Sequence, residues 1–168
     1  MISKTDGGGF KAIITPYGGW RNPEAPSGEN YGAIMDDIEV FNFAVGEVPD
    51  LLHKTMQLSN SSSDNYDCLV LHQANLFIMK QIAKKTGFSM DKTLVSLDVF
   101  GNTSSSSVPI SLVKEYGESK NEKELHTLMC GFGVGLSWST VDCYVNEKDI
   151  LPLIHTDEYF EDGYMSAE

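Results

Sequence analysis

Two short apolar runs, each followed by a polar cluster and a helix-like pattern, constrain the fold of this chain most. The run 68–71 ends in His72-Gln73-Ala74-Asn75, and the run 94–100 ends in Gly101-Asn102-Thr103-Ser104. Runs of this length are typical of buried strands, and the residues that follow have the spacing of an amphipathic helix. Open α/β sheets bind ligands outside the carboxyl ends of their strands. The two clusters therefore mark the predicted site, although neither contains an obvious nucleophile.

The other patterns extend this unit to the order β-α-β-α-β-β, preceded by a glycine- and proline-rich opening and a first helix. The helix is expected to kink or restart at Pro49, because proline lacks the backbone N–H that a helix needs. The last two strands form a predicted antiparallel hairpin around the glycine loop 131–135. The expected fold is α/β, with a mixed, five-stranded-type sheet and helices packed on its faces. The predicted strands cover 10–14, 66–71, 94–99, 125–130 and 136–145, and the predicted helices cover 35–58, 75–86 and 103–116.

The composition is that of one globular domain. The chain has 168 residues, of which 41% are hydrophobic and 21% charged. Its net charge of −12 disfavours binding to nucleic acid or to anionic membranes. No apolar run approaches the ~20 residues of a membrane span, and the N-terminus lacks the pattern of a secretory signal. The predicted compartment is cytoplasmic, with a domain at 1–145 and an acidic C-terminal extension at 146–168.

The cysteines and the scattered histidines do not indicate a metal site. Cys68, Cys130 and Cys143 are odd in number and show no Cys-x-x-Cys spacing, which argues against disulfides and zinc. Each lies in a strand pattern and is interpreted as a core residue. His53, His126 and His155 share no ligand spacing either, so the sequence predicts no metal.

Two polar residues are the candidates for chemistry, and each has an alternative structural role. His72 precedes a predicted helix, whose N-terminus disfavours the imidazolium form. A neutral imidazole donates one hydrogen bond and can polarise a carbonyl oxygen, but the residue can equally stabilise the turn. The amide of Asn102 can donate to a developing oxyanion, or the side chain can cap the next helix. The residues alone leave these alternatives open.

The serine run and the glycine loop contribute less. The serines at 104–107 lack the Gly-x-Ser-x-Gly context and a recognisable base, so they are interpreted as a small-residue helix start that satisfies its own N–H groups. The loop 131–135 is followed by a strand instead of the helix that a phosphate-binding loop requires. It is interpreted as a tight turn whose backbone N–H groups can serve an oxyanion.

Taken in order, His-Gln-Ala-Asn, Gly-Asn-Thr-Ser and Gly-Phe-Gly-x-Gly-Leu-Ser-Trp make the chain similar to the β-ketoacyl-acyl-carrier-protein synthase III family from about Asp6 to about Val145. That family has the thiolase fold, built from two similar α/β halves, and the chain resembles the C-terminal half only. The resemblance implies an acyltransferase that performs a decarboxylating Claisen condensation in fatty-acid or related acyl-chain biosynthesis. The family's nucleophilic cysteine belongs to the N-terminal half, so the chain alone is expected to be inactive.

The resemblance also implies roles for individual residues. His72 and Asn102 are expected to donate hydrogen bonds to the malonyl thioester oxygen, and the backbone N–H of Val134 is expected to bind the oxyanion of the condensation step. Further positions match the pantetheine arm, the surroundings of the active-site cysteine and the dock for the carrier protein. These are Ala74, Asn75 and Phe132 for the substrate, and Lys84 and Lys85 for the carrier protein, since Phe77 stands where the family often has a basic residue.

No resident cofactor is expected, because the substrates carry coenzyme A or phosphopantetheine. The expected partners are acyl carrier protein, the N-terminal half of the enzyme and, in the full-length protein, a second copy in a homodimer. The alternative is a non-catalytic thiolase-like module that binds carrier protein or another partner.

Overall fold

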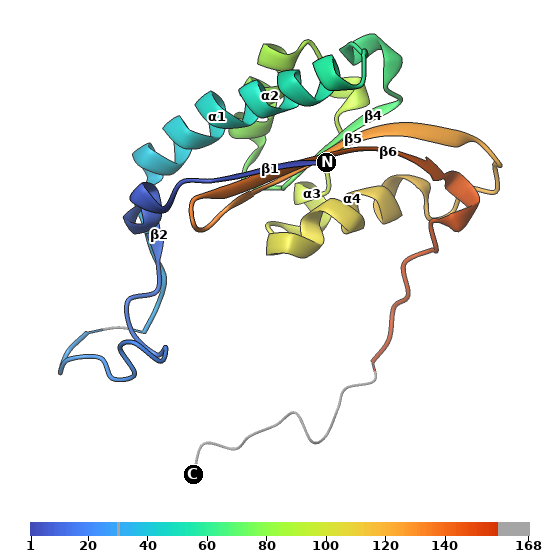
Figure 1. The fold of residues 1–168 in the computed structure, drawn as a ribbon. Helices are drawn as coiled ribbons and strands as arrows, with labels where there is room; N and C mark the ends of the chain where they lie inside the picture. Colours follow the sequence, from blue (N-terminus) through green and yellow to red (C-terminus); the bar gives the residue numbers. More distant parts are fainter. Residues whose placement is uncertain (30, 158–168) are drawn as a thin grey trace.

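The computed structural model describes residues 1–29 and 31–157, and its centre is a mixed β-sheet (Figure 1). The strand order is β1-β6-β5-β4. β4 runs parallel to β5, whereas β5 with β6 and β1 with β6 are antiparallel. The strands of this sheet are β1 (Ile2–Thr5), β4 (Cys68–Leu71), β5 (Glu124–Gly133) and β6 (Ser137–Asn146), and a separate two-stranded sheet pairs β2 (Ile13–Ile14) with β3 (Ile34–Met35).

Helices cover both faces of the sheet. α1 (Asp37–Leu58) and α2 (Leu76–Thr86) lie on one face, and α3 (Leu97–Phe100) and α4 (Ser107–Tyr116) lie on the other (Figure 1). Short 3-10 turns connect these elements: η1 (Gly7–Ala12), η2 (Ser63–Asn65), η3 (Met90–Lys92), η4 (Ser104–Ser106) and η5 (Glu147–Asp149).

The core follows from the alternation of side chains along β4, whose four residues are all buried. Leu69 and Leu71 enter the larger hydrophobic cluster, which α1 and α2 cover. Cys68 and Val70 point to the opposite face and join a smaller cluster with Leu112 of α4. A strand that is apolar on both faces needs cover on both, and the helices provide it.

The local signals of the sequence predicted several elements well. The hairpin of β5 and β6 is present, and Gly133 pairs with Ser137 at its tip. α2 begins after Asn75, whose side chain accepts from the backbone N–H of Ile78, and ends at Gly87 in the left-handed conformation. Capping residues of these types predict such boundaries because they satisfy the free backbone groups of a helix end.

The predicted strand at 94–99 is wrong. Only Thr93 bridges to Leu69 of β4, and α3 begins at Leu97. The buried amide of Gln73 takes the place of a strand partner: its Nε2 donates to the carbonyl oxygen of Leu94, and its Oε1 accepts from the N–H of Ser96. The sheet therefore ends at β4 apart from one bridge, because a side chain already satisfies the next backbone groups.

Other boundaries differ from expectation. α1 continues through Pro49 as one helix. The predicted strand at 10–14 shortens to β2, and the predicted helix at 103–116 divides into η4 and α4. β1 was not predicted.

At the C-terminal end, Glu147 is buried and accepts hydrogen bonds from Ser119 and Asn121. The acidic extension at 146–168 thus begins in packed structure, while its residues 158–168 lie outside the described part of the chain.

Candidate functional site

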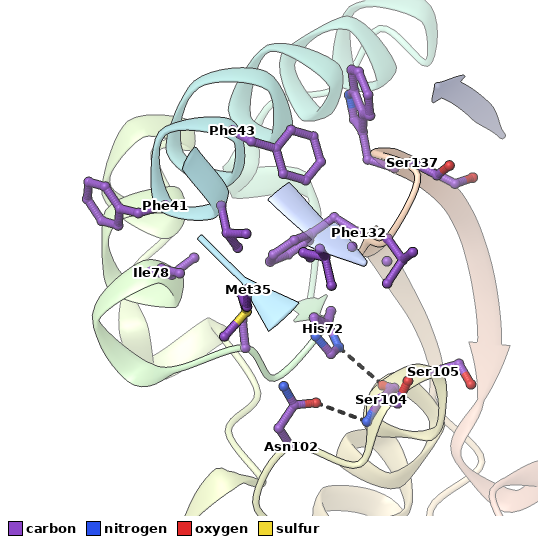
Figure 2. A pocket seen from close by; sticks show the side chains of 18 of the residues that line it. Met35, Phe41, Phe43, His72, Ile78, Asn102, Ser104, Ser105, Phe132 and Ser137 are labelled. Atoms are coloured by element: carbon purple, nitrogen blue, oxygen red, sulfur yellow. Dashed lines mark hydrogen bonds between the residues drawn. The ribbon is translucent and has the colours of Figure 1, made fainter. Parts of the chain in front are cut away.

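A cavity of about 1190 Å³ lies at the carboxyl end of β4, between the start of α2, the loop before α4 and the tip of the β5–β6 hairpin. Most of its wall is apolar, with Met35, Phe41, Phe43 and Ile78 among the lining residues (Figure 2). The cavity brings six of the predicted site residues together, from three separate parts of the sequence. They are His72, Ala74, Asn75, Asn102, Phe132 and Val134.

One residue, Ser104, holds the two polar candidates through its backbone. Its N–H donates to Oδ1 of Asn102 at 2.9 Å, and its carbonyl oxygen lies 3.1 Å from Nδ1 of His72 (Figure 2). Ser104 has φ of +55°, a conformation that non-glycine residues rarely adopt. Such strain persists where the surrounding structure enforces it, and it is frequent at functional sites.

The contact with Ser104 fixes the orientation of the Asn102 amide. An N–H can only donate, so the atom that faces it must be the amide oxygen. The amide nitrogen then points away from Ser104 and, within the described residues, makes no hydrogen bond (Figure 2). Because Asn102 lines the cavity, this donor is available to a ligand there.

Nδ1 of the His72 ring has two hydrogen-bonding contacts, whereas Nε2 makes none within the described residues. Nδ1 contacts the Ser104 carbonyl and lies 2.8 Å from Oγ of Ser107, while the ring of Phe132 is nearly perpendicular to the imidazole at a centroid distance of 5.3 Å. Burial lowers the pKa of His72, and the bond to the Ser104 carbonyl offsets this only in part. The neutral ring is therefore the prevailing form at neutral pH, with Nε2 left for the cavity.

The hairpin tip closes the cavity on another side. Phe132 lies at the end of β5, and Val134 follows in the turn with an exposed side chain. Gly135 has φ of +141°, and a Cβ atom there would lie 2.3 Å from Oγ of Ser137. The turn thus requires glycine at this position.

The two predicted carrier-protein contacts lie outside the cavity, on the exposed side of α2. Nζ of Lys85 is already engaged: it donates to the carbonyl oxygen of Val45 in α1 at 2.7 Å. Phe77 stacks on Phe41 with a centroid distance of 5.7 Å and remains 60% exposed. Aromatic side chains therefore lie beside the cavity where the family often has a basic residue.

None of the three cysteines is placed to act as a nucleophile in this cavity. Burial raises the pKa of Cys68 to about 11 and that of Cys130 to about 12, so both stay protonated near neutral pH. Cys143 lies on β6 beside Thr127, and the cavity lining includes no cysteine. In the part of the chain that the structure describes, no cluster of three metal-ligating side chains occurs. No helix in this part is long and apolar enough to span a bilayer.

Sequence analysis missed the organising roles of Ser104 and Ser107. It interpreted both as part of a helix start, and Oγ of Ser107 does lie 2.6 Å from the Ser104 carbonyl oxygen, as in a capped turn. Their contacts with His72 join positions 32 and 35 residues apart. Only the unusual density of serines after Gly-Asn-Thr hinted at more than a cap.

The mixed sheet with helices on both faces, and the polar site at its strand ends, define a thiolase-like α/β protein. Residues 56–142 match the model of the family described as 3-oxoacyl-[acyl-carrier-protein (ACP)] synthase III C terminal. The chain belongs to this family.

Individual relatives agree with this assignment. The β-ketoacyl-[acyl-carrier-protein] synthase III of Streptococcus sanguinis is 36% identical over 140 residues, which are 82% of this chain and 43% of the relative. Among solved structures, the 3-oxoacyl-(acyl-carrier protein) synthase of Burkholderia xenovorans superposes with a TM-score of 0.83 at 34% identity, covering 92% of this chain and 46% of that one. A priming β-ketosynthase of the R1128 polyketide pathway gives a TM-score of 0.71 at 28% identity, covering 90% and 44%. The chain spans less than half the length of these proteins.

Proposed function

We propose that this chain is the C-terminal part of a 3-oxoacyl-acyl-carrier-protein synthase III and supplies the groups that stabilise the enolate in a decarboxylating Claisen condensation. The relatives, which are named as β-ketoacyl- or 3-oxoacyl-acyl-carrier-protein synthases, support the reaction class. The observation that carries the assignment is the shared contact with Ser104: its N–H donates to Asn102, its carbonyl oxygen faces Nδ1 of His72, and both side chains line one cavity.

In the proposed reaction, an acyl group from coenzyme A first forms a thioester with a cysteine of the N-terminal half. Malonyl on acyl carrier protein then loses carbon dioxide, and the enolate carbon attacks the carbonyl carbon of the acyl thioester. The new carbon–carbon bond forms as the carbon–sulfur bond breaks and the cysteine thiolate leaves. Nδ2 of Asn102 and Nε2 of His72 donate to the malonyl thioester oxygen, where negative charge develops. The backbone N–H of Val134 binds the oxyanion that forms in the condensation step. The pantetheine arm and its surroundings contact Ala74, Asn75 and Phe132. The carrier protein contacts Lys84 and Lys85.

The remaining features of the proposal follow from the family. The full-length protein is a cytoplasmic homodimer, needs no resident cofactor and works in fatty-acid or related acyl-chain synthesis. Residues 1–145 form the domain that carries the site, and 146–168 form an extension to it. The high pKa values of Cys68 and Cys130 support the need for an external nucleophile.

The test is a condensation assay with acetyl-coenzyme A and malonyl carrier protein. We expect no turnover by the chain alone, and turnover when it is co-purified with an N-terminal half that carries the nucleophilic cysteine. His72→Ala or Asn102→Ala should then lower kcat by about 10²–10³-fold, since each removes one oxyanion donor. Asp98→Asn, on the exposed side of α3, is the matched control. Unchanged kcat in both site variants would contradict the proposal.

A second candidate is a non-catalytic module that binds carrier protein, and the protonated cysteines are consistent with it as well. If this function is correct, the chain alone binds carrier protein. Adding an N-terminal half then gives no turnover.

A further inference from the structure

We propose that Ser107 is a positioning residue that selects the Nε2–H tautomer of His72 by donating its hydroxyl hydrogen to Nδ1. This inference rests on the proposed function in one respect: a thioester oxygen can only accept, so His72 serves it only with a hydrogen on Nε2. A neutral imidazole carries one hydrogen, so Nδ1 must then present a lone pair. The question is which neighbour of Nδ1 can donate to that lone pair.

The two hydrogen-bonding contacts of Nδ1 differ in chemistry. Ser104 offers a carbonyl oxygen at 3.1 Å, which only accepts and would favour the opposite tautomer, with hydrogen on Nδ1. Ser107 offers a hydroxyl at 2.8 Å, which can either donate or accept. Within the described residues, Ser107 is therefore the one contact of Nδ1 able to support a hydrogen on Nε2.

The other contacts of the Ser107 hydroxyl favour donation of its hydrogen to Nδ1 of His72. The backbone N–H of Gln73 donates to Oγ of Ser107 at 3.2 Å and occupies one of its lone pairs. The alternative acceptor, the Ser104 carbonyl at 2.6 Å, already receives the backbone N–H of Ser107. With the hydroxyl hydrogen turned to Nδ1, that nitrogen gains a donor, and the Ser104 carbonyl keeps the backbone N–H of Ser107 as its donor. Ser107 is completely buried, so water does not compete for this hydrogen.

The cluster also explains why a charged ring is not needed. Burial lowers the pKa of His72, which removes the imidazolium as the source of the Nε2 hydrogen near neutral pH. A neutral donor requires a defined tautomer, and the tautomer of a histidine is set by the hydrogen bond at its other nitrogen. Here that bond comes from a helix-start serine 35 residues away in sequence.

The experiment reads the tautomer directly, on the ¹⁵N-labelled chain without substrate. Long-range ¹H–¹⁵N spectra of the imidazole at about pH 8, above the ordinary histidine pKa, distinguish the nitrogen that carries hydrogen from the one that does not. His72→Gln assigns the signals. We expect Nε2–H in the wild type, Nε2–H in Ser107→Thr, which retains the hydroxyl, and Nδ1–H in Ser107→Ala, where only the Ser104 carbonyl remains.

Ser111→Ala is the matched control. This serine is equally buried on the same helix and bonds the Ser107 carbonyl and Ser96, but not His72. Its variant should keep the wild-type tautomer. Nδ1–H in the wild type, or Nε2–H in Ser107→Ala, would overturn the proposal, and the wild-type spectrum decides even if Ser107→Ala does not fold. The tautomer experiment measures no turnover. Its outcome is therefore independent of whether the condensation assay succeeds or fails.

Discussion

At the scale of single residues, His126 has close contacts on all sides outside the cavity, near the start of β5. Its Nδ1 contacts the carbonyl oxygen of Asn65 at 3.1 Å, and its Nε2 contacts Oδ1 of Asp142 at 2.8 Å. Tyr66 and Tyr144 lie against the ring at centroid distances of 4.1 and 4.3 Å. Tyr66 also donates to Asp142 at 2.5 Å. The Asp142 carboxylate therefore has hydrogen-bonding contacts with both a buried histidine and a buried tyrosine.

Replacing this carboxylate should make stability depend on pH. Burial raises the pKa of Asp142, but hydrogen bonds from Tyr66, Ser59 and His126 outweigh it and leave the pKa lowered. A carboxyl group with a lowered folded-state pKa stabilises the fold above its unfolded pKa, and this contribution is lost as pH falls through the folded value. We expect Asp142→Asn to reduce the free energy of unfolding by about 1–3 kcal/mol at neutral pH, because an amide cannot satisfy both donors.

Urea unfolding of wild type and variant across the acid range measures this effect. The difference between them should begin to shrink below about pH 4, where the carboxylate of the unfolded chain takes up a proton, and it should shrink further as pH falls through the lower folded-state pKa. Asp98→Asn is the control, since Asp98 pairs with Lys114 in an exposed position and its loss should change little. A pH-independent difference for Asp142→Asn would contradict the electrostatic explanation.

At the scale of elements, the continuity of α1 through Pro49 depends on a neighbouring helix. In an α-helix, the carbonyl of Val45 would accept from the backbone N–H of residue 49, which proline lacks. Nζ of Lys85, on α2, donates to this carbonyl at 2.7 Å instead. A side chain of α2 thereby fills the gap that proline leaves in α1, and the same bond joins the two helices.

This arrangement predicts coupling between two distant positions. Lys85→Met should lower the free energy of unfolding by about 1–2 kcal/mol, because it leaves the Val45 carbonyl without its donor. In a Pro49→Ala background the cost should be smaller, since the new backbone N–H can bond the same carbonyl. A double-mutant cycle by thermal or chemical unfolding measures the difference. Lys84→Met, also exposed on α2, is the control, and a coupling energy of zero between positions 49 and 85 would refute the explanation.

Features that depend on neighbouring residues could be predicted from the sequence, whereas features that depend on contacts between distant residues could not. The caps of α2 and the β5–β6 hairpin depend on neighbouring residues, so their signals are local. The predicted strand at 94–99 failed because the Gln73 amide, 21 and 23 residues away, occupies its backbone groups. The meeting of His72 and Asn102 at one cavity was expected because each follows an apolar run, although only the run before His72 is a strand. The contacts of Ser107 did not, because a serine at a helix start has the same local pattern whether or not it faces a histidine.

At the scale of the whole molecule, the three cysteines differ in how strongly the fold shields their thiols from solvent. Cys68 and Cys130 are 1% exposed and lie on the two faces of the sheet, whereas Cys143 is partly exposed on β6. Burial raises the pKa of the two core thiols, so the folded chain presents almost no thiolate at either. Their reactivity therefore requires opening of the structure.

Alkylation with iodoacetamide near neutral pH should follow this order. We expect Cys143 to be modified first in the folded chain, with Cys68 and Cys130 reacting only after denaturation. Mass spectrometry of peptides taken over time measures each site, and the chain in guanidinium is the control in which all three react. Labelling of Cys68 or Cys130 as fast as Cys143 under native conditions would show that the core opens readily, contrary to the packing described.

The pairing of β1 with β6 has a consequence for solubility. Ile2–Thr5 covers part of the outer edge of a ten-residue strand, in register with Ser137–Thr140. Without it, the N–H and C=O groups at the hairpin end of β6 would be open to strands of other molecules, which is how sheet edges seed aggregation. β1 is itself short, and its Lys4 lies over Trp138 and near Glu47, so it is a poor template for further pairing. By occupying this part of the β6 edge, β1 thus prevents strands of other molecules from pairing there.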